Sequence, residues 1–275
     1  MAASRNVVTH MVARAALELI SRYFKRDRID ALVVKGVATG PLLYRNVGER
    51  PISDLDLRVR RNDLTRIVAL ARRENLRIVR YSRAYQSVIV RIHDFDVDIE
   101  SCIGAPGLCS LSTDEMFERA CFQECGGLGV LTPELHDHVL LLCVNVFKDK
   151  IRAASPSAIR DLELITQLEN FDAKRFALLV ERKHARTIVS IVADWLARER
   201  ANETWRHIRD EMAPPRQPYA SLFRALIRGR PNRWALRVLA RVANDDPAER
   251  VRALVVLGRW VAERHAARRD TTPAN

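Results

Sequence analysis

The chain has 275 residues, of which 48% are hydrophobic and 29% are charged, and its formal net charge is +12. This composition is typical of a globular protein with one large or two ordinary domains, and it excludes both a largely disordered chain and a run of roughly 20 apolar residues that would span a membrane. The first residues lack the basic start and apolar block of a secretion signal, and the five cysteines show no paired zinc-ligand spacing, so the sequence predicts a cytoplasmic protein with reduced thiols.

Helix and strand patterns alternate in the first part of the chain. Apolar residues recur at helical spacing over residues 7–24, and a short apolar run over 29–34 predicts a buried strand that Lys35 and Gly36 end. The next predicted elements are a helix over 37–44, a polar loop over 45–52, a strand over 54–60, a helix over 63–75 capped by Asn62, and strands over 76–81, 85–92 and 94–100. Such alternation favours a sheet flanked by helices.

The pattern changes near residue 130. Residues 102–129 contain five glycines and predict an irregular segment. Thr132, Pro133 and Glu134 have the residue types of a helix start, and helical periodicity continues from there to Arg269 with breaks at proline-containing segments. We therefore expect an α+β protein, with an α/β domain over residues 1–130 and an all-helical domain over residues 131–275.

Two acidic residues interrupt the apolar pattern of the strand predicted over 54–60. Side chains alternate between the two faces of a strand, so Asp54 and Asp56 share one face and the apolar residues share the other. Two adjacent carboxylates repel each other and resist desolvation unless a cation lies between them. Mg²⁺ prefers such hard oxygen ligands together with phosphate oxygens, which indicates phosphoryl or nucleotidyl chemistry. The alternative is a strand face that is simply solvated.

A second acidic strand is predicted over residues 94–100. Its apolar residues share one face, and four acidic residues share the other. The acidic residues are Asp94, Asp96, Asp98 and Glu100. Four acids on one strand face are unfavourable unless water or a metal ion solvates them, so this strand supplies further candidate metal ligands.

The order of these features resembles the DNA polymerase β-like nucleotidyltransferase superfamily: a strand, a Lys-Gly turn, a short helix, a strand with Asp-x-Asp, and a later acidic strand. The likeness extends to the bacterial branch of uncharacterised nucleotidyltransferases, over roughly residues 15–195. The matching segments are residues 32–36, 43–44, 50–57, 97–99, 131–134 and 159–165. The Lys-Gly turn and the spacing from Arg50 to the aspartates are also similar to those of abortive-infection nucleotidyltransferase toxins.

The resemblance implies a mixed sheet with flanking helices, and it implies a role for particular residues. Asp54, Asp56 and Asp98 would be the catalytic residues and would hold two Mg²⁺ ions about 3.5–4 Å apart on a nucleoside triphosphate (NTP). Gly36 would let the backbone approach the phosphates closely. Further nucleotide-binding candidates are Lys35, Arg50, Ser53, Lys148 and Arg160. For the basic residues, the alternative is an ordinary solvated or paired surface charge.

The sequence departs from the superfamily pattern at two positions. Val37 follows the Lys-Gly turn where Gly or Ser is usual, so a serine contact to phosphate is missing. Glu100 stands two residues after Asp98, where the branch often has His, and this leaves Asp96, Asp98 and Glu100 as alternative third ligands. We favour Asp98 because its apolar neighbours match the pattern.

Most of the positive charge lies near the C-terminus. Residues 216–269 contain thirteen arginines and four acidic residues, which gives +9. Arginines at helical spacing form a basic stripe that is a candidate nucleic-acid surface, with Trp234 or Trp260 available for stacking. The stripe consists of Arg230, Arg233, Arg237 and Arg241. The alternative is a solvated helix face.

These observations predict an enzyme. We expect a Mg²⁺-dependent nucleotidyltransferase that moves a nucleoside monophosphate from an NTP to a hydroxyl or phosphate acceptor and releases pyrophosphate. The alternatives are a catalytically lapsed nucleotide- or RNA-binding module and a toxin-like enzyme that acts on tRNA. The acceptor stays open among RNA, protein and small molecules, because a fold does not fix a substrate. No membrane partner is expected.

Overall fold

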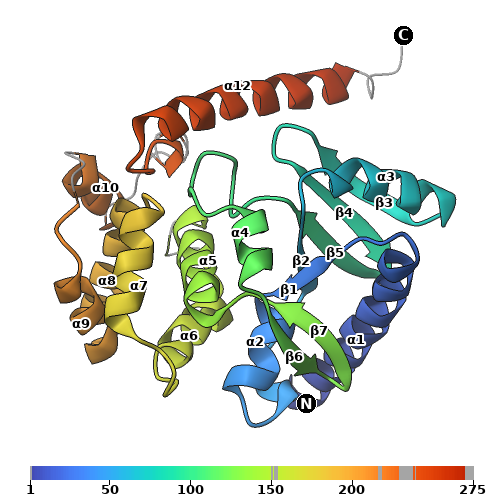
Figure 1. Ribbon diagram of the computed structural model, residues 1–275, viewed down its shortest axis with the longest axis horizontal. Coiled ribbons are helices and arrows are strands. Elements are labelled where there is room, and N and C mark those ends of the chain that lie inside the picture. Colours follow the sequence, from blue (N-terminus) through green and yellow to red (C-terminus); the bar gives the residue numbers. More distant parts are fainter. Residues whose placement is uncertain are drawn as a thin grey trace.

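The computed structural model describes residues 2–149, 151, 154–215, 219–228, 238 and 240–269. Within them, one mixed sheet of seven strands has the order β3-β4-β5-β2-β1-β7-β6 (Figure 1). The strands are β1 (Ala31–Val34), β2 (Asp54–Val59), β3 (Arg77–Ser82), β4 (Ser87–Ile92), β5 (Phe95–Glu100), β6 (Cys121–Cys125) and β7 (Leu128–Thr132).

Helices flank the sheet and make up most of the described chain after β7. Those before β7 are α1 (Ala2–Arg26), α2 (Gly36–Leu43), the 3₁₀ helix η1 (Val47–Glu49), α3 (Asp63–Arg73) and α4 (Thr113–Glu118). Those after it are α5 (Leu135–Lys148), α6 (Pro156–Ile165), α7 (Ala173–Arg182), α8 (Arg186–Glu199), α9 (Glu203–Glu211), α10 (Tyr219–Arg228) and α12 (Pro247–Arg269). The α+β class, with a mixed sheet followed by a helical region, is confirmed.

The centre of the sheet brings the two acidic strands together. β2 pairs antiparallel with β1 and parallel with β5, and β1 also pairs parallel with β7. Parallel neighbours need a crossover connection, which α3 and the β3–β4 hairpin supply between β2 and β5. The connection through α3, β3 and β4 therefore lets β2 and β5 run in the same direction and pair directly with each other.

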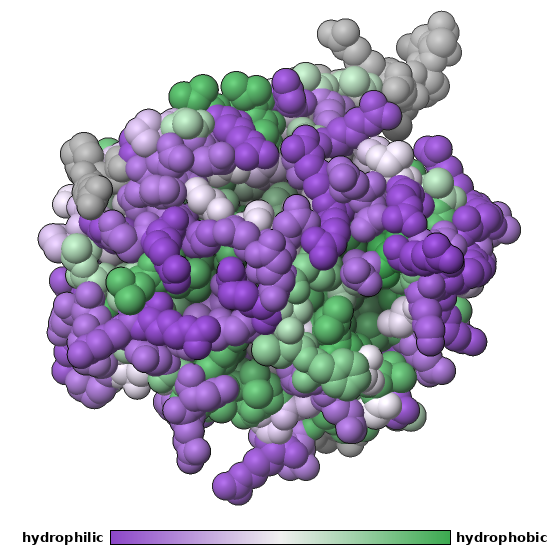
Figure 2. Space-filling view, in the orientation of Figure 1, coloured by the Kyte–Doolittle hydropathy of each residue, from purple (hydrophilic) through white to green (hydrophobic). Residues whose placement is uncertain are grey.

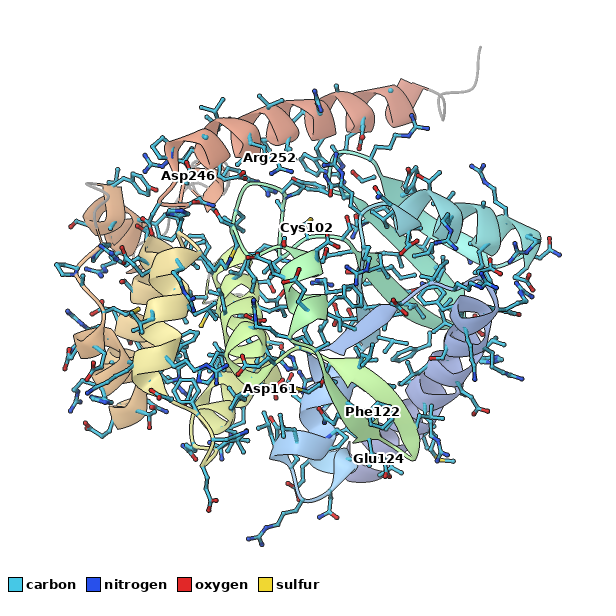
Figure 3. The ribbon with its side chains drawn as sticks, in the orientation of Figure 1. Cys102, Phe122, Glu124, Asp161, Asp246 and Arg252 are labelled. Atoms are coloured by element: carbon cyan, nitrogen blue, oxygen red, sulfur yellow. The ribbon has the colours of Figure 1, made fainter. Side chains whose placement is uncertain are left out.

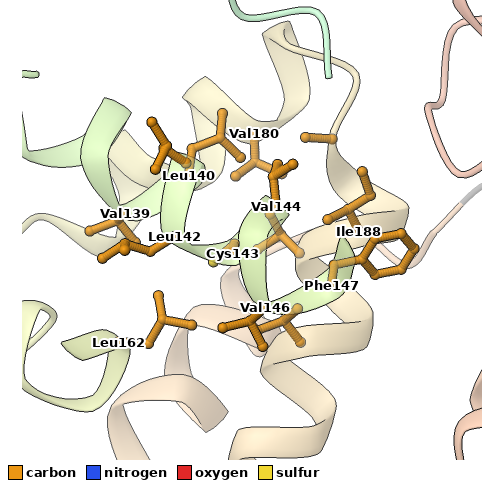
Figure 4. Packing of buried hydrophobic residues seen from close by; sticks show 14 of the residues in the cluster. Val139, Leu140, Leu142, Cys143, Val144, Val146, Phe147, Leu162, Val180 and Ile188 are labelled. Atoms are coloured by element: carbon orange, nitrogen blue, oxygen red, sulfur yellow. The ribbon is translucent and has the colours of Figure 1, made fainter. Parts of the chain in front are cut away.

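Each face of the sheet belongs to a different hydrophobic cluster. Because successive side chains of a strand point to opposite faces, β1 contributes to both. Val33 packs with residues of α1, α3 and β2, whereas Leu32 and Val34 pack with residues of the helical region. α5 runs through the middle of this second cluster, and Figure 4 shows its apolar side chains packed against those of α6, α7 and α8. The sheet face that carries the acidic residues is thus the face that the helical region covers.

The segment over 102–129 is more regular than its glycines suggest. It contains α4, β6 and the start of β7, and only the stretch after β5 lacks a helix or a strand. Gly126 and Gly127 have φ angles of 61° and 82° and form the turn of the β6–β7 hairpin. These glycines therefore mark a tight turn between strands, and the prediction of an irregular segment is wrong for its second half.

Of the two predicted helix starts, the one at Thr132 lies at the wrong residue, and the one at Asn62 lies at the right residue but lacks the expected side-chain contact. Thr132 is the last residue of β7, and the N-cap of α5 is Glu134, whose carboxylate accepts backbone N–H groups of His136 and Asp137. Asn62 precedes α3 but its side chain makes no capping hydrogen bond.

α12 crosses over the loop after β5 and the β3–β4 hairpin (Figure 1). The face of the molecule seen in Figure 2 is mostly hydrophilic, with a hydrophobic patch over the start of α12, where Val251, Leu254 and Val255 are exposed. Among the described residues, none of the helices combines the length and the apolar character that crossing a lipid bilayer requires.

Candidate active site

Charged residues face each other in three successive pairs across β2 and β5. The parallel register places Asp54 opposite Asp96, Asp56 opposite Asp98, and Arg58 opposite Glu100. Neighbouring strands lie about 4.8 Å apart, so the side chains of each pair are close neighbours. The apolar residues between them lie in the cluster beneath α1 and α3, as the strand alternation predicts for both segments.

The two outer carboxylates of β5 have arginine partners. Asp96 lies at the edge of the site and accepts Arg91 Nε at 2.8 Å and Arg91 Nη2 at 3.1 Å. Glu100 pairs with Arg58, whose Nη2 lies 2.6 Å from Glu100 Oε2. Burial by itself raises the pKa of Glu100, but the charge of Arg58 together with those of Lys148, Lys35 and Arg80 holds that pKa below its usual range. Both carboxylates are therefore neutralised by the protein itself.

Asp98, between them, has no such partner. Its Oδ1 atom is buried and makes no hydrogen bond in the structure. Burial, followed by the charges of Glu100 and Asp56, raises the pKa of Asp98 to about 6. A buried carboxylate oxygen without a donor is unfavourable, so this position is suited to a cation or a proton that the chain does not supply.

Asp54 stands at the open end of the same face. Ser53 Oγ donates a hydrogen bond of 3.0 Å to Asp54 Oδ1. Burial, followed by the charge of Asp56, raises the pKa of Asp54. Like Asp98, it is a carboxylate whose ionised form is disfavoured by its surroundings and would be favoured by a nearby cation.

Lys35 lies in the turn between β1 and α2. Its φ of 55° bends the chain sharply, and its backbone N–H donates to His138 Nε2 at 3.1 Å. Its ammonium lies 2.5 Å from Asp56 Oδ1. Burial lowers the pKa of Lys35, but the carboxylate of Asp56 more than offsets this and the pKa is raised. Lys35 is therefore a fixed positive charge inside the site and not the solvated end of a strand.

Gly36 follows at a point where no side chain fits. A Cβ atom there would lie 2.8 Å from Ile52 Cγ2 and 3.0 Å from Arg50 Nη1. The absence of a side chain lets the N-terminus of α2 pack directly against the loop that precedes β2.

Arg50 is tied to the helical region. Its guanidinium is buried and pairs with Asp161 of α6, with Nη2 at 2.6 Å and Nε at 3.2 Å from Asp161 Oδ2. Asp161 is fully buried and also accepts the hydroxyls of Thr39 and Tyr44, each at 2.8 Å. Figure 3 shows Asp161 where α6 meets α2. This cluster holds the loop before β2 in place. Because Asp161 already compensates the charge of Arg50, little of that charge is left for a ligand.

These elements enclose a hollow of about 590 Å³, which we call the acidic hollow. Its lining includes Lys35, Gly36, Arg50, Ser53, Asp54, Asp56, Asp98, Asn145, Lys148 and the start of α6 at residues 155–158. A hollow of this size lies within the range of ~300–1,000 Å³ that small ligands and cofactors occupy.

Most of the candidate residues therefore meet in one place, but not all. Lys148 lies at the end of α5 and lines the acidic hollow. Arg160 does not line it, because it lies on an outer face of α6 and its Nη1 is 3.4 Å from Glu163 Oε2. Arg241 contacts Tyr85 at a different place. The other arginines of the predicted stripe, Arg230, Arg233 and Arg237, lie outside the described residues.

The residues of the acidic hollow fit a divalent cation. In the part of the chain that the structure describes, no three His, Cys, Asp or Glu side chains already form a metal-binding group. Mg²⁺, however, is usually held by one or two carboxylates together with phosphate oxygens and water, so a complete protein cage is not expected. The buried Asp98 Oδ1 without a donor, next to Asp56 in the register, is the observation that fits such an ion.

Sequence patterns did not identify the buried residues whose hydrogen bonds hold Lys35 and Arg50 in place. The buried cluster of Asp161, Thr39 and Tyr44 and the acceptor His138 come from segments far apart in the chain. Burial lowers the pKa of His138 to about 4, so it stays a neutral acceptor for the Lys35 N–H. One signal was available for Asp161, which lies among the apolar residues Ala158, Leu162 and Ile165 on the buried side of α6.

A family model described as uncharacterised nucleotidyltransferase matches residues 2–202. No curated protein matches the chain in sequence. Among solved structures, the chain is similar to the antibiotic-resistance factor ANT(2″)-Ia in solution (TM-score 0.45, 12% identity, 74% of this chain and 98% of that chain).

Two further solved structures show a similar degree of likeness. One is the crystal structure of ANT(2″)-Ia in complex with adenylyl-2″-tobramycin (TM-score 0.45, 13% identity, 61% of this chain and 94% of that chain). The other is an antigenic nucleotidyltransferase-like protein from Paracoccidioides brasiliensis (TM-score 0.37, 12% identity, 71% of this chain and 92% of that chain).

Proposed function

Because this chain belongs to the uncharacterised nucleotidyltransferase family, whose model matches residues 2–202, we propose that it is a Mg²⁺-dependent enzyme whose active site is the acidic hollow. It transfers a nucleoside monophosphate from an NTP to a hydroxyl or phosphate acceptor and releases pyrophosphate. The observation that carries this proposal is the pair of Asp56 and Asp98 across β2 and β5, with Asp98 Oδ1 buried and without a donor.

Asp54, Asp56 and Asp98 would hold the metal together with the phosphate oxygens of the NTP. When bound, Mg²⁺ supplies charge stabilisation for the phosphate that is attacked and for the pyrophosphate that leaves. Lys35 adds a second positive charge beside Asp56 and reduces the repulsion between the two central carboxylates in the absence of nucleotide. Gly36 lines the acidic hollow at the N-terminus of α2, whose backbone N–H groups favour anions such as the phosphates.

Asp98 has a second role in this proposal. Its carboxylate lines the acidic hollow, where it can act as a base toward a bound acceptor. It accepts the proton of the acceptor hydroxyl as that oxygen forms a bond to the α-phosphorus, and the bond from the α-phosphorus to the bridging oxygen breaks. Atoms and charge balance, because the electron pair of the broken bond leaves with pyrophosphate and the proton stays on Asp98.

Arg50 acts as a positioning residue in this scheme. Its guanidinium lines the acidic hollow but is compensated by Asp161, so it holds the loop before β2 and contributes little net charge. Lys148, which lines the hollow from α5 and has no ion-pair partner among the described residues, is the stronger candidate to contact the phosphates.

The test is transfer of label from each NTP, labelled at the α-phosphate, into the fractions of a total cell lysate in the presence of Mg²⁺. Asp54→Asn and Asp56→Asn should abolish both transfer and Mg²⁺-dependent NTP binding. Asp96→Asn is the matched control, because Asp96 lies opposite Asp54 on the neighbouring strand β5 but is paired with Arg91 at the edge of the site. Undiminished transfer in the first two variants contradicts the proposal, and NTP binding without transfer to any fraction indicates a lapsed enzyme.

A further inference from the structure

A second hollow lies beside the acidic hollow and shares Lys148 with it. It has a volume of about 260 Å³, and we call it the basic hollow. The lining residues that matter here are Arg80, Tyr85, Glu100, Lys148, Arg241 and Trp260. Glu100 stands two residues beyond Asp98 on the same face of β5, a distance of about 7 Å along the strand. A ligand in the basic hollow is therefore within reach of the proposed base.

Specific contacts build the wall that α12 contributes. Glu263 accepts the hydroxyl of Ser82 at 2.7 Å and the backbone N–H of Ala84 at 2.9 Å, which holds α12 to the β3–β4 turn. At the other end, Gly107 packs so closely on α12 that a Cβ atom there would lie 2.6 Å from the carbonyl oxygen of Glu249. The basic hollow is thus enclosed by elements that are fixed to one another, and it is not a gap between loosely placed helices.

The charge of this lining favours an anion. Arg80, Lys148 and Arg241 supply three positive charges, and the carboxylate of Glu100 is already paired with Arg58. Phosphate groups are the anions that several converging arginine and lysine side chains recognise best, whereas a polycationic ligand would be repelled.

The aromatic side chains of the lining favour a planar ring. Tyr85 and Trp260 have ring centroids 5.4 Å apart, and Trp260 is only partly buried. Arg241 lies 4.9 Å from the centroid of the Tyr85 ring and holds it in place. A partly exposed indole next to guanidinium groups is the arrangement on which nucleobases stack. The volume lies just below the ~300–1,000 Å³ of typical ligand pockets, so one small unit fits and a length of polymer does not.

We infer that the basic hollow is the acceptor site and that it binds a nucleotide, with the phosphate among Arg80, Lys148 and Arg241 and the base against Trp260. The nucleotide is either free or the terminal unit of a strand, since both present the same chemistry. The inference rests on the proposed function for the step itself: a sugar hydroxyl of this nucleotide forms the new bond to the α-phosphorus of the NTP, pyrophosphate leaves, and Asp98 takes the proton.

The first experiment compares acceptors with the full chain, Mg²⁺ and α-labelled NTPs. The probes are a ribonucleoside monophosphate, a short single-stranded oligoribonucleotide, the same oligoribonucleotide without its terminal hydroxyls, and an amino sugar. Label on either of the first two supports the inference and identifies the source of the nucleotide. Label on the amino sugar alone, or undiminished label on the strand without terminal hydroxyls, overturns it.

The second experiment separates the basic hollow from the catalytic residues. Trp260→Ala and Arg80→Gln should each raise the KM for the nucleotide acceptor roughly tenfold, while kcat and the KM for the NTP stay unchanged. Trp260→Phe, which keeps a stacking surface, should restore most of the loss. Arg206→Gln is the matched control, because Arg206 is an exposed arginine on α9. An unchanged acceptor KM in both Trp260→Ala and Arg80→Gln overturns the inference.

The third measurement keeps this inference distinct from the proposed function. Binding of a fluorescent oligoribonucleotide and of a fluorescent nucleoside monophosphate is measured with the Asp56→Asn variant, which lacks the proposed NTP site. Binding that Arg80→Gln weakens roughly tenfold supports the basic hollow even if no transfer occurs. Absence of binding for both probes overturns it even if the chain transfers nucleotides to another acceptor.

Discussion

Asp98 and Asp161 are both buried aspartates, and the structure treats them in opposite ways. Asp161 is fully buried, but two hydroxyls and the guanidinium of Arg50 compensate it. Asp98 lies between two other acidic residues, its Oδ1 has no donor, and its pKa is raised to about 6. The donors and the counter-charge of Asp161 all come from the chain itself, whereas Asp98 Oδ1 lacks a donor, whose place a ligand could take.

This difference separates a residue that stabilises the fold, Asp161, from a residue proposed to take part in the reaction, Asp98. A buried carboxylate with a full set of donors stabilises the fold and offers nothing to a substrate. One without donors costs stability in the free protein, and that cost is recovered when a cation binds. Asp98→Asn should therefore lower the activity without lowering the stability, whereas Asp161→Asn should lower the stability.

The largest effect is expected for Asp98→Asn on activity. Removal of the charge and of the proton acceptor should lower the rate of nucleotidyl transfer by at least about a thousandfold. The free energy of unfolding should not fall, because the variant removes an unfavourable buried charge. Steady-state transfer kinetics and urea unfolding check both parts. Asp96→Asn should stay within about threefold of the unmodified chain in rate, since its pair with Arg91 is partly exposed.

The next effect is on stability at the other aspartate. Asp161→Asn leaves the buried guanidinium of Arg50 without a counter-charge and should lower the free energy of unfolding by about 3–5 kcal/mol. Urea unfolding at pH 7 measures it. Asp210→Asn removes an exposed partner of Arg209 and should cost less than about 1 kcal/mol. If the two variants are equally stable, the cluster around Asp161 does not have the structural role assigned to it.

His138 predicts a pH dependence of stability. Its pKa in the folded chain is about 4, against a usual value of 6.5 in the unfolded chain. As the pH falls, the unfolded chain binds the proton first, so stability is complete above about pH 6.5 and is lost progressively down to about pH 4. The full loss is on the order of 3 kcal/mol. Unfolding midpoints across this window measure the slope, and His138→Gln should flatten it.

The smallest effect is expected on the outer surface of the helical region. Arg206 pairs with Glu203 within α9, and both side chains are exposed. Arg206→Ala should change the free energy of unfolding by less than about 0.5 kcal/mol, and added salt should reduce that difference further. A larger change would mean that exposed pairs matter as much as buried ones in this chain, which would weaken the contrast drawn from Asp161.

The sequence predicted the two acidic strands of the site better than it predicted the partners of their side chains. The alternation in residues 54–60 and 94–100 predicted which side chains share a face, because a strand has a fixed period of two. It left Asp96, Asp98 and Glu100 as alternative third ligands and favoured Asp98 from its apolar neighbours, whereas the structure distinguishes them by the register and the arginine partners. The division into domains near residue 130 stays a prediction; one cluster contains residues from both sides of it, such as Leu32 and Val139.

Local patterns in the chain determined the class of the fold, the two acidic strand faces and the glycine turn at Gly36, since each depends on residues only a few positions apart. The tertiary structure alone decided that β2 and β5 pair in parallel, that Asp161 reaches Arg50 from α6, and that α12 lines a basic hollow that shares Lys148 with the acidic hollow. These arrangements depend on contacts between segments up to about 180 residues apart, such as Ser82 with Glu263. Chain periodicity carries no information about such contacts, because they arise only when separate elements pack and compete to bury their apolar faces.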